Sequence, residues 1–357
     1  MSFRTRRVIF ITPFYTLFEF FLLKYLLLLI GKVWDGHILI LALLIGILHL
    51  VPMFFEAKKS RKITRFLSTV DGVWMWASVM FLIDIVVIYL IGSFIKIPYV
   101  FVLILLAVVP VLGVYNYYKA HKLIVHERIL TFDNLDSEIR IAHLSDVHFG
   151  SVRHRGIIKD VALKLKELED SCDIAIISGD LADGSSIVEE DDLMALADVG
   201  MPIVFTPGNH DFYPGIDNVL NAVRNAGIIV LDNDSFEFKN LNIYGLTFSF
   251  GDIEMPSSED LKNSIKPDKI NIINYHVPSN WKEFTSLGFN LQLSGHSHGG
   301  QFYPVVWFGD MMFKYNRGLF GDKLGNYIHV TTGVGSMDTP MRWGTDSEIV
   351  VLKLKKS

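Results

Sequence analysis

The stretch "PIVFTPGNHD", residues 202–211, passes from an apolar run into a Pro-Gly turn and then into Asn209, His210 and Asp211. A short apolar run rich in β-branched and aromatic residues, closed by a turn dipeptide, is typical of a buried β-strand. The strand therefore delivers three polar side chains to the loop that follows it. This pattern predicts a site at the end of a strand.

Four further apolar runs end in the same way. They are followed by Asp146 and His148, by Asp180, by His276, and by His296 and His298. In open α/β sheets, ligands bind beyond the carboxyl ends of the strands, because the sheet fixes the loops that carry the polar side chains. We therefore expect the five strand ends to meet in one cleft.

Residues 123–357 alternate short β-rich runs with amphipathic helical stretches, which is typical of a layered α/β domain. Between the first two runs, apolar residues recur at helical spacing, as at Ile158, Val161 and Leu165. The predicted strands span residues 138–145, 173–178, 202–206, 227–231, 242–247, 270–275, 291–294, 327–332 and 347–354.

The polar residues at the strand ends have the chemistry of metal ligands. Imidazole and carboxylate groups suit divalent ions such as Mn, Fe or Zn, and sulfur ligands are missing from the set. Seven candidate ligands are too many for one tetrahedral ion but suit a pair of ions. Paired ions activate a bridging water and clamp phosphoryl oxygens, so the sequence predicts phosphoester hydrolysis.

The motifs resemble those of the calcineurin-like metallophosphoesterases, whose signature is D-x-H, G-D, G-N-H-D/E, H and G-H-x-H. Here it reads "DVH" at 146–148, "GD" at 179–180, "GNHD" at 208–211, His276 and "GHSH" at 295–298. The resemblance implies a four-layer α/β/β/α sandwich over residues 123–357. It also implies two divalent metal ions, with Mn preferred and Fe, Zn or Mg as alternatives.

The resemblance further implies a role for each site residue. Asp146, His148 and His298 would hold the first ion, Asn209, His276 and His296 the second, and Asp180 would bridge them. His210 would be the general acid that protonates the leaving oxygen, with Asp211 orienting its ring.

Residues 1–122 have a different composition and are predicted to form a transmembrane domain. They contain 13 Lys and Arg against 5 Asp and Glu, which leaves 20 against 33 for the remainder of the chain, a net charge of −13. Four apolar stretches are each close to the ~20 residues that cross a bilayer as a helix. These stretches span residues 8–30, 37–55, 72–94 and 97–118. A soluble helical bundle is disfavoured because these stretches have no polar face.

The basic residues predict the orientation of the helices. They gather at the N-terminus, in the loop near residues 58–65 and after the fourth stretch, all on one side under four crossings. We therefore expect a multi-pass protein of the inner membrane with its catalytic domain in the cytoplasm. The alternative is that "TRRVIFI", residues 5–11, acts as a twin-arginine export signal, but no cleavage site follows it.

Two features near the C-terminus point to a lipid substrate. "GHSHGGQ" at 295–301 and "TTGVGSMDTPMRW" at 331–343 resemble a lipid-acting subgroup that includes UDP-2,3-diacylglucosamine hydrolases of lipid A synthesis. Arg342 would then either bind phosphate or serve the fold. Trp307 and Phe308 would either receive an acyl chain or the bilayer surface, or be buried in the fold.

The leading prediction is therefore a membrane-embedded two-metal hydrolase of a lipid-linked phosphoester or pyrophosphate, most specifically that of UDP-2,3-diacylglucosamine. Its partners would be that lipid and the bilayer. The first alternative is a tethered phosphodiesterase or phosphomonoesterase with a broader or soluble substrate, and the second is a non-catalytic scaffold. The acidic second half argues against nucleic acid as a partner, and the sequence indicates no protein partner. A single cysteine, Cys172, rules out an internal disulfide.

Overall fold

The computed structural model describes residues 3–31, 34–249 and 254–357. Within these residues, four helices are long and apolar enough to cross a membrane. They are α1 (Phe3–Ile30), α2 (Asp35–Glu56), α3 (Lys62–Gly92) and α4 (Tyr99–His121). The four predicted apolar helices are thus confirmed, and the chain is a membrane protein.

Helix α3 differs from its prediction because it begins at Lys62 rather than at residue 72. The ten residues "KITRFLSTVD" contain charged and hydroxyl side chains, which lower the hydropathy but do not interrupt a helix. The prediction from hydropathy therefore located the apolar part of α3 but not its polar first turns.

Two of the ionisable side chains of the helices, Glu19 and Lys24, have polar partners on a neighbouring helix. The buried carboxylate of Glu19 accepts hydrogen bonds from the Trp74 indole at 3.0 Å and the Ser78 hydroxyl at 2.8 Å. The Lys24 ammonium lies 3.1 Å from Asp35. Since a polar group in an apolar interior needs partners, Glu19 fixes α1 against α3.

The second part of the chain begins directly after α4 and contains two six-stranded sheets in its described residues. The first sheet has the order β1-β12-β2-β3-β4-β5, with β1 (Leu123–Phe132), β2 (Ile139–Leu144), β3 (Ile174–Ser178), β4 (Ile203–Thr206), β5 (Ile229–Val230) and β12 (Ser347–Lys356). The second has the order β10-β11-β9-β8-β7-β6, with β6 (Asp234–Phe238), β7 (Leu241–Leu246), β8 (Ile270–Tyr275), β9 (Leu291–Ser294), β10 (Gly318–Gly321) and β11 (Tyr327–Val330).

The two sheets pack face to face, and helices cover their outer faces. Along β3, Ile174 and Ile176 point into the core between the sheets, whereas Ala175 and Ile177 pack in the outer helical layer. Helices α5 (Arg155–Leu168) and α6 (Ile216–Asn225) cover the first sheet, and α7 (Ser258–Asn263) and α8 (Trp281–Leu287) lie on the second. This is the predicted four-layer α/β/β/α sandwich.

Short helices complete the fold near the ends of the strands. They are η1 (Met194–Leu196), η2 (His210–Phe212), η3 (His298–Gly300) and α9 (Val305–Met312). Strands β2, β3 and β4 run parallel in the first sheet, and β7, β8, β9 and β11 run parallel in the second. The loops after β2, β3 and β4, and those after β8 and β9, therefore lie at one end of their sheets.

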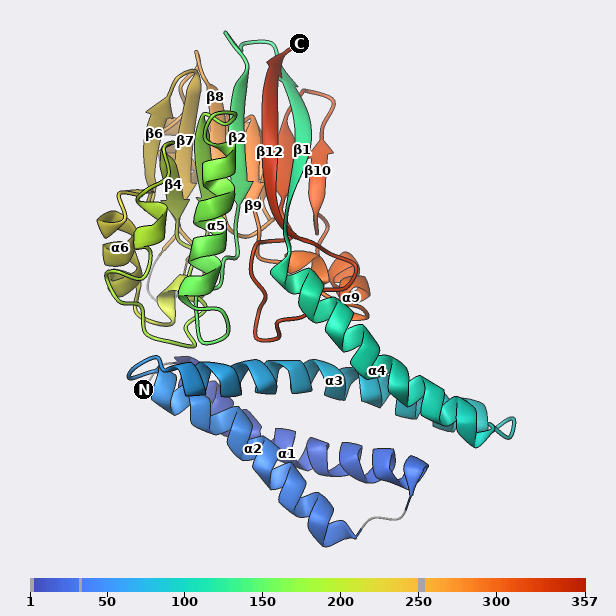
Figure 1. Ribbon diagram of the computed structural model, residues 1–357. Helices are drawn as coiled ribbons and strands as arrows, with labels where there is room; N and C mark the ends of the chain where they lie inside the picture. Colours follow the sequence, from blue (N-terminus) through green and yellow to red (C-terminus); the bar gives the residue numbers. More distant parts are fainter. Residues whose placement is uncertain (1–2, 32–33, 250–253) are drawn as a thin grey trace.

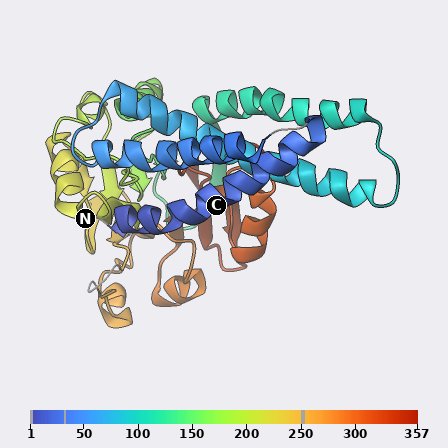
Figure 2. The same cartoon turned by 90° about the horizontal axis from the view of Figure 1, so that it is seen from below.

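The membrane helices lie across that end of the sandwich, and the C-terminus lies at the opposite end (Figure 1). Seen from the helix side, the four helices extend across the sandwich and beyond it (Figure 2). Met341 packs into an apolar cluster with Trp76, Met80 and Val109 of α3 and α4. The Lys119 ammonium lies 2.7 Å from Asp346. The helices are therefore packed against the sandwich as well as joined to it.

Candidate active site

The predicted metal ligands lie together at the strand ends that face the helices. The ligand atoms of Asp146, His148 and His298 lie within 4.8 Å of one another, and the same holds for those of Asp180, His276 and His296. Asn209 joins the second group, with its Oδ1 3.0 Å from Nδ1 of His296. The two groups are adjacent, because Nε2 of His276 lies 3.0 Å from Asp180 and 3.9 Å from Asp146.

The backbone at these positions is strained. Asp146, His148, Asp180, His296 and His298 all have positive φ, between 50° and 70°. Residues other than glycine seldom adopt this conformation, and such strain gathers at functional sites. The sharp turns after the strands thus aim the side chains inward.

Glycines allow the loops to approach closely. A Cβ at Gly295 would overlap the side chains of Ser145 and Asp146, and a Cβ at Gly208 would overlap Asp180. The "GNH" and "GHSH" motifs therefore carry glycine because their loops pack against neighbouring carboxylates, whereas Gly179 of the "GD" motif packs against His276 and the Gly208 backbone.

The nitrogen atoms of the histidines fit a metal centre. His276 donates its Nδ1–H to the Ser178 carbonyl at 2.7 Å, which leaves Nε2 facing Asp180 at 3.0 Å, where it could bind a metal ion once deprotonated. Among the described residues, this buried Nε2 has no hydrogen-bond partner. In the first group, Nε2 of His148 and Nε2 of His298 face each other at 3.0 Å. Facing imidazole nitrogens beside buried carboxylates are a donor set suited to divalent cations.

The buried carboxylates of the site also favour the binding of cations. Burial raises the pKa of Asp146, but the neighbouring histidines His298, His148 and His276 outweigh burial and hold that pKa well below its usual range. Burial opposes protonation of His276, yet Asp180 and Asp146 raise its pKa to about 10. The carboxylates therefore attract a cation, and metal ions compete with protons for such a site.

His210 lies beside the first group of ligands. Its backbone N–H donates to Asp180 at 2.8 Å, and its ring lies 5.0 Å from the His148 ring, centroid to centroid. Nδ1 faces the Asp183 carbonyl at 3.3 Å, so Nε2 is the nitrogen left for proton exchange with a substrate. Burial lowers the pKa of His210.

Asp211 has a different role from the predicted one. Its buried carboxylate accepts three backbone hydrogen bonds, from the N–H groups of Asp180 at 2.9 Å, Ala182 at 2.8 Å and Gly208 at 2.8 Å. The prediction that Asp211 orients the His210 ring is wrong, because the Asp183 carbonyl faces that ring. Burial raises the pKa of Asp211 to about 7, and the Asp180 carboxylate adds to this rise.

Comparison with known proteins identifies this arrangement. Residues 139–300 match the family model of the calcineurin-like phosphoesterases. An uncharacterized metallophosphoesterase of Aquifex aeolicus is 31% identical over 257 residues, which cover 68% of this chain and 96% of that protein. The chain belongs to the calcineurin-like metallophosphoesterase family.

Other relatives are longer than the matched region. An uncharacterized metallophosphoesterase of Helicobacter pylori is 27% identical over 236 residues, which cover 64% of this chain and 63% of that protein. A zebrafish (Danio rerio) transmembrane protein with a metallophosphoesterase domain is 25% identical over 276 residues, covering 72% of this chain and 63% of that protein. The chain therefore spans less than two thirds of the length of these two relatives.

Arg342 of this metallophosphoesterase serves the fold and not a substrate surface. Its side chain is fully buried, and its guanidinium donates to the carbonyls of Thr332 at 2.7 Å, Gly335 at 2.5 Å and Asp346 at 2.7 Å. Because these donors are occupied inside the protein, the predicted phosphate contact is corrected to a structural role.

Trp307 and Phe308 lie on the exposed face of α9, with 62% and 58% of their surfaces accessible. Met311 and Met312 extend this apolar face, whereas Val306 anchors the helix in the interior. Figure 1 shows α9 at the end of the catalytic domain that faces the membrane helices. The alternative that Trp307 and Phe308 are buried in the fold is therefore wrong, and their contact with lipid stays a prediction.

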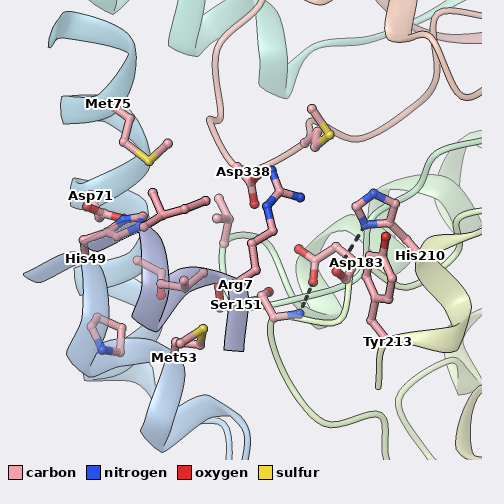
Figure 3. Close-up of a pocket in the computed structure, with 17 residues that line it drawn as sticks. Arg7, His49, Met53, Asp71, Met75, Ser151, Asp183, His210, Tyr213 and Asp338 are labelled. Atoms are coloured by element: carbon pink, nitrogen blue, oxygen red, sulfur yellow. Dashed lines mark hydrogen bonds and ion pairs between the residues drawn. The ribbon is translucent and has the colours of Figure 1, made fainter. Parts of the chain in front are cut away.

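A cavity of about 290 Å³ separates the catalytic site from the membrane helices. The catalytic domain lines it with Ser151, Asp183, His210, Tyr213 and Asp338, and α1, α2 and α3 line it with Arg7, His49, Met53, Asp71 and Met75, among others (Figure 3). The sequence motifs of the site include neither Tyr213 nor any of these helix residues. For Tyr213, the only sequence feature that indicates a place near the site is its position two residues after the "GNHD" motif.

Proposed function

We propose that this protein is a metal-dependent phosphoesterase that hydrolyses a phosphoester or pyrophosphate bond in a membrane lipid-linked substrate. The observation that carries the proposal is the cavity between His210 and the membrane helices. A substrate that enters this cavity meets the catalytic domain on one side and the transmembrane domain on the other. A soluble substrate would not need a cavity with one side formed by membrane helices.

The site residues divide the chemistry as follows. Asp146, His148 and His298 would hold one divalent ion, Asn209, His276 and His296 would hold the other, and Asp180 lies between both groups. When bound, the two ions, for which we propose Mn, supply a hydroxide and neutralise phosphoryl charge.

His210 would donate the proton to the leaving group, and neighbouring polar groups position it. His210 gives a proton from Nε2 to the leaving oxygen, and the Asp183 carbonyl keeps the ring oriented by accepting from Nδ1. Asp211 holds the loops after β3 and β4 together through its three backbone hydrogen bonds. The position of His210 relative to the metal ligands is thus fixed.

The most specific form of the proposal is hydrolysis of the pyrophosphate of UDP-2,3-diacylglucosamine, which would release UMP and leave a phosphate on the acylated sugar. The motifs at 295–301 and 331–343 support it through their resemblance to that subgroup. The exposed apolar face of α9 also supports a lipid substrate.

We place the catalytic domain on the cytoplasmic face of the inner membrane. The support comes from the sequence: Lys and Arg gather at the N-terminus, at residues 58–65 and after the fourth helix, whereas the first and third segments between helices carry one lysine each. A donor lipid with a nucleotide headgroup would be available from that side.

Two alternatives make different predictions. A tethered phosphoesterase of soluble substrates would use the helices only as an anchor, and full activity of residues 119–357 alone on the true substrate would favour it. A non-catalytic scaffold is disfavoured because all seven ligand positions and His210 are present.

The experiment is mass spectrometry of extracts from cells depleted of the protein. A lipid that accumulates with its phosphoester or pyrophosphate intact is the expected result, and its mass identifies the substrate. Accumulation of a soluble phosphoester with an unchanged lipid profile would contradict the lipid substrate and support the tethered alternative.

A further inference from the structure

Arg7 of helix α1 lies on the wall of the catalytic cavity. It lines the same cavity as His210, although 203 positions separate Arg7 from the proposed acid in the sequence. Figure 3 shows the Arg7 side chain extending from α1 toward Asp338, in front of the loop that bears Asp183. A membrane helix thus brings a guanidinium to the catalytic site.

The loop around Asp338 is built into the helical bundle. A Cβ at Gly72 of α3 would overlap the Asp338 carbonyl, so the loop and α3 are in close contact. Asp338 and His210 line the same cavity. Arg7 is therefore directed to a carboxylate on the wall that also carries the proposed acid.

The cavity has polar and apolar residues on both walls, but most of its apolar residues come from the membrane helices. The helices contribute the apolar Val8, Ile11, Pro52, Met53 and Met75 beside the polar Arg7, His49, Ser68 and Asp71. The catalytic side contributes the polar Ser151, Asp183, Ser185, His210, Tyr213 and Asp338, with Val152 and Met337. An amphiphile whose phosphorylated headgroup faces His210 would therefore find apolar contacts for its stem on the helix wall.

The size of the cavity limits what it can hold. Its volume of about 290 Å³ lies near the lower end of the ~300–1,000 Å³ range of small-molecule sites. A space of this size leaves no room for acyl chains, which would extend outside it along the helices. The residues that line it therefore meet the polar part of a lipid.

We propose that Arg7 binds an anionic group of the headgroup that does not react, such as the second phosphate of a pyrophosphate. A guanidinium offers planar paired donors that match phosphate oxygens. The inference rests on the proposed lipid-linked substrate and makes the transmembrane domain part of the active site. Arg7 would then hold the scissile phosphorus in place for His210.

The neighbouring Arg6 provides a matched control. Both arginines belong to the basic N-terminal segment that sets the membrane orientation, but Arg6 does not line the cavity. Replacing either one removes the same charge from the same segment. Of the two, Arg7 alone lines the cavity, so a headgroup contact predicts a loss in Arg7→Ala and none in Arg6→Ala.

The test compares the full-length variants Arg7→Ala, Arg7→Lys and Arg6→Ala in detergent. Each is assayed with UDP-2,3-diacylglucosamine in mixed micelles and with the small ester bis-p-nitrophenyl phosphate. For Arg7→Ala, we expect the ratio of lipid to small-ester kcat/KM to fall about tenfold or more, since a charged hydrogen bond is lost. The loss should lie mainly in KM, Arg7→Lys should recover part of it, and Arg6→Ala should match the wild type.

An unchanged ratio in Arg7→Ala, with a wild type that cleaves the lipid, overturns this inference and leaves the proposed function standing. An equal fall in Arg6→Ala also overturns it, because the effect would then belong to the charge of the segment. A wild type that cleaves only the small ester overturns the proposed lipid substrate, and the inference with it. If Arg7→Ala does not fold, the ratio for Arg7→Lys, which keeps the charge but loses the paired donors, decides between these outcomes.

Discussion

The Asp211 carboxylate lies 2.9 Å from the backbone nitrogen of Asp180 and accepts its hydrogen. This contact joins the loop after β4 to the loop after β3, and two more N–H groups donate to the same carboxylate. A residue next to the proposed acid thus organises the backbone beneath the metal ligands. Its loss should affect the metal centre before it affects proton transfer.

Replacing Asp211 with Ala should destabilise the metal centre. Three buried N–H groups would lose their acceptor, and each such loss costs about 1–3 kcal/mol. We expect a lower thermal midpoint in detergent and less than two metal ions per chain by elemental mass spectrometry. Wild-type stability and metal content with a reduced kcat would instead support a role in orienting the His210 ring.

Replacing His210 with Asn should lower kcat by about 10²- to 10⁴-fold on esters whose leaving group needs a proton. The loss should be smaller on p-nitrophenyl esters, because p-nitrophenolate departs without protonation. Measuring kcat across leaving groups of different pKa checks this, with metal content as the control. An equal loss on all leaving groups would exclude His210 as the general acid.

Replacing Asp180 with Asn should remove metal from both positions. Asp180 lies 3.0 Å from His276 and 4.0 Å from His148, one residue of each ligand group. We expect the wild type to hold two divalent ions per chain and the variant to hold fewer, with activity lost in parallel. Asp192→Asn is the control, since Asp192 is also buried but pairs with Arg155. Retention of two tightly bound ions in Asp180→Asn would refute the bridging position.

Replacing Trp307 and Phe308 together with Ser should lower activity on lipid more than on a small soluble ester. Both side chains are exposed on α9, so their removal leaves no cavity in the core. Leu324→Ser is the control, because Leu324 is 86% exposed in the turn between β10 and β11, away from α9. We expect the lipid activity to fall severalfold in the α9 variant only, as measured by initial rates in vesicles. Equal losses on both substrates would reject a lipid contact.

Sequence patterns located the interior of the fold better than its edges. Strands such as β3 are buried on both faces, so they appear as continuous apolar runs. The three strands that were not predicted, β1, β6 and β10, are all edge strands, and β1 carries exposed Glu127 and Arg128 in its middle. An edge strand is partly exposed and needs fewer apolar residues, so the apolar sequence pattern that predicts a strand is weaker there.

The candidate ligands were predictable because each follows such a strand within a short motif. The roles of Asp211 and Arg342 were not, since they depend on which backbone groups lie opposite in space. The place of Arg7 was also outside the reach of sequence patterns, which indicated only its effect on membrane orientation. It follows from packing between helices and sandwich, and that packing joins segments far apart in the chain.

The most direct test of the central claim is the hydrolysis of UDP-2,3-diacylglucosamine by the purified full-length protein reconstituted in vesicles. UMP release is measured with Mn²⁺, with a chelator, and with the Asp180→Asn variant. We predict UMP release that requires the metal and Asp180. A folded protein that retains two metal ions but leaves every phosphorylated lipid intact would contradict the account.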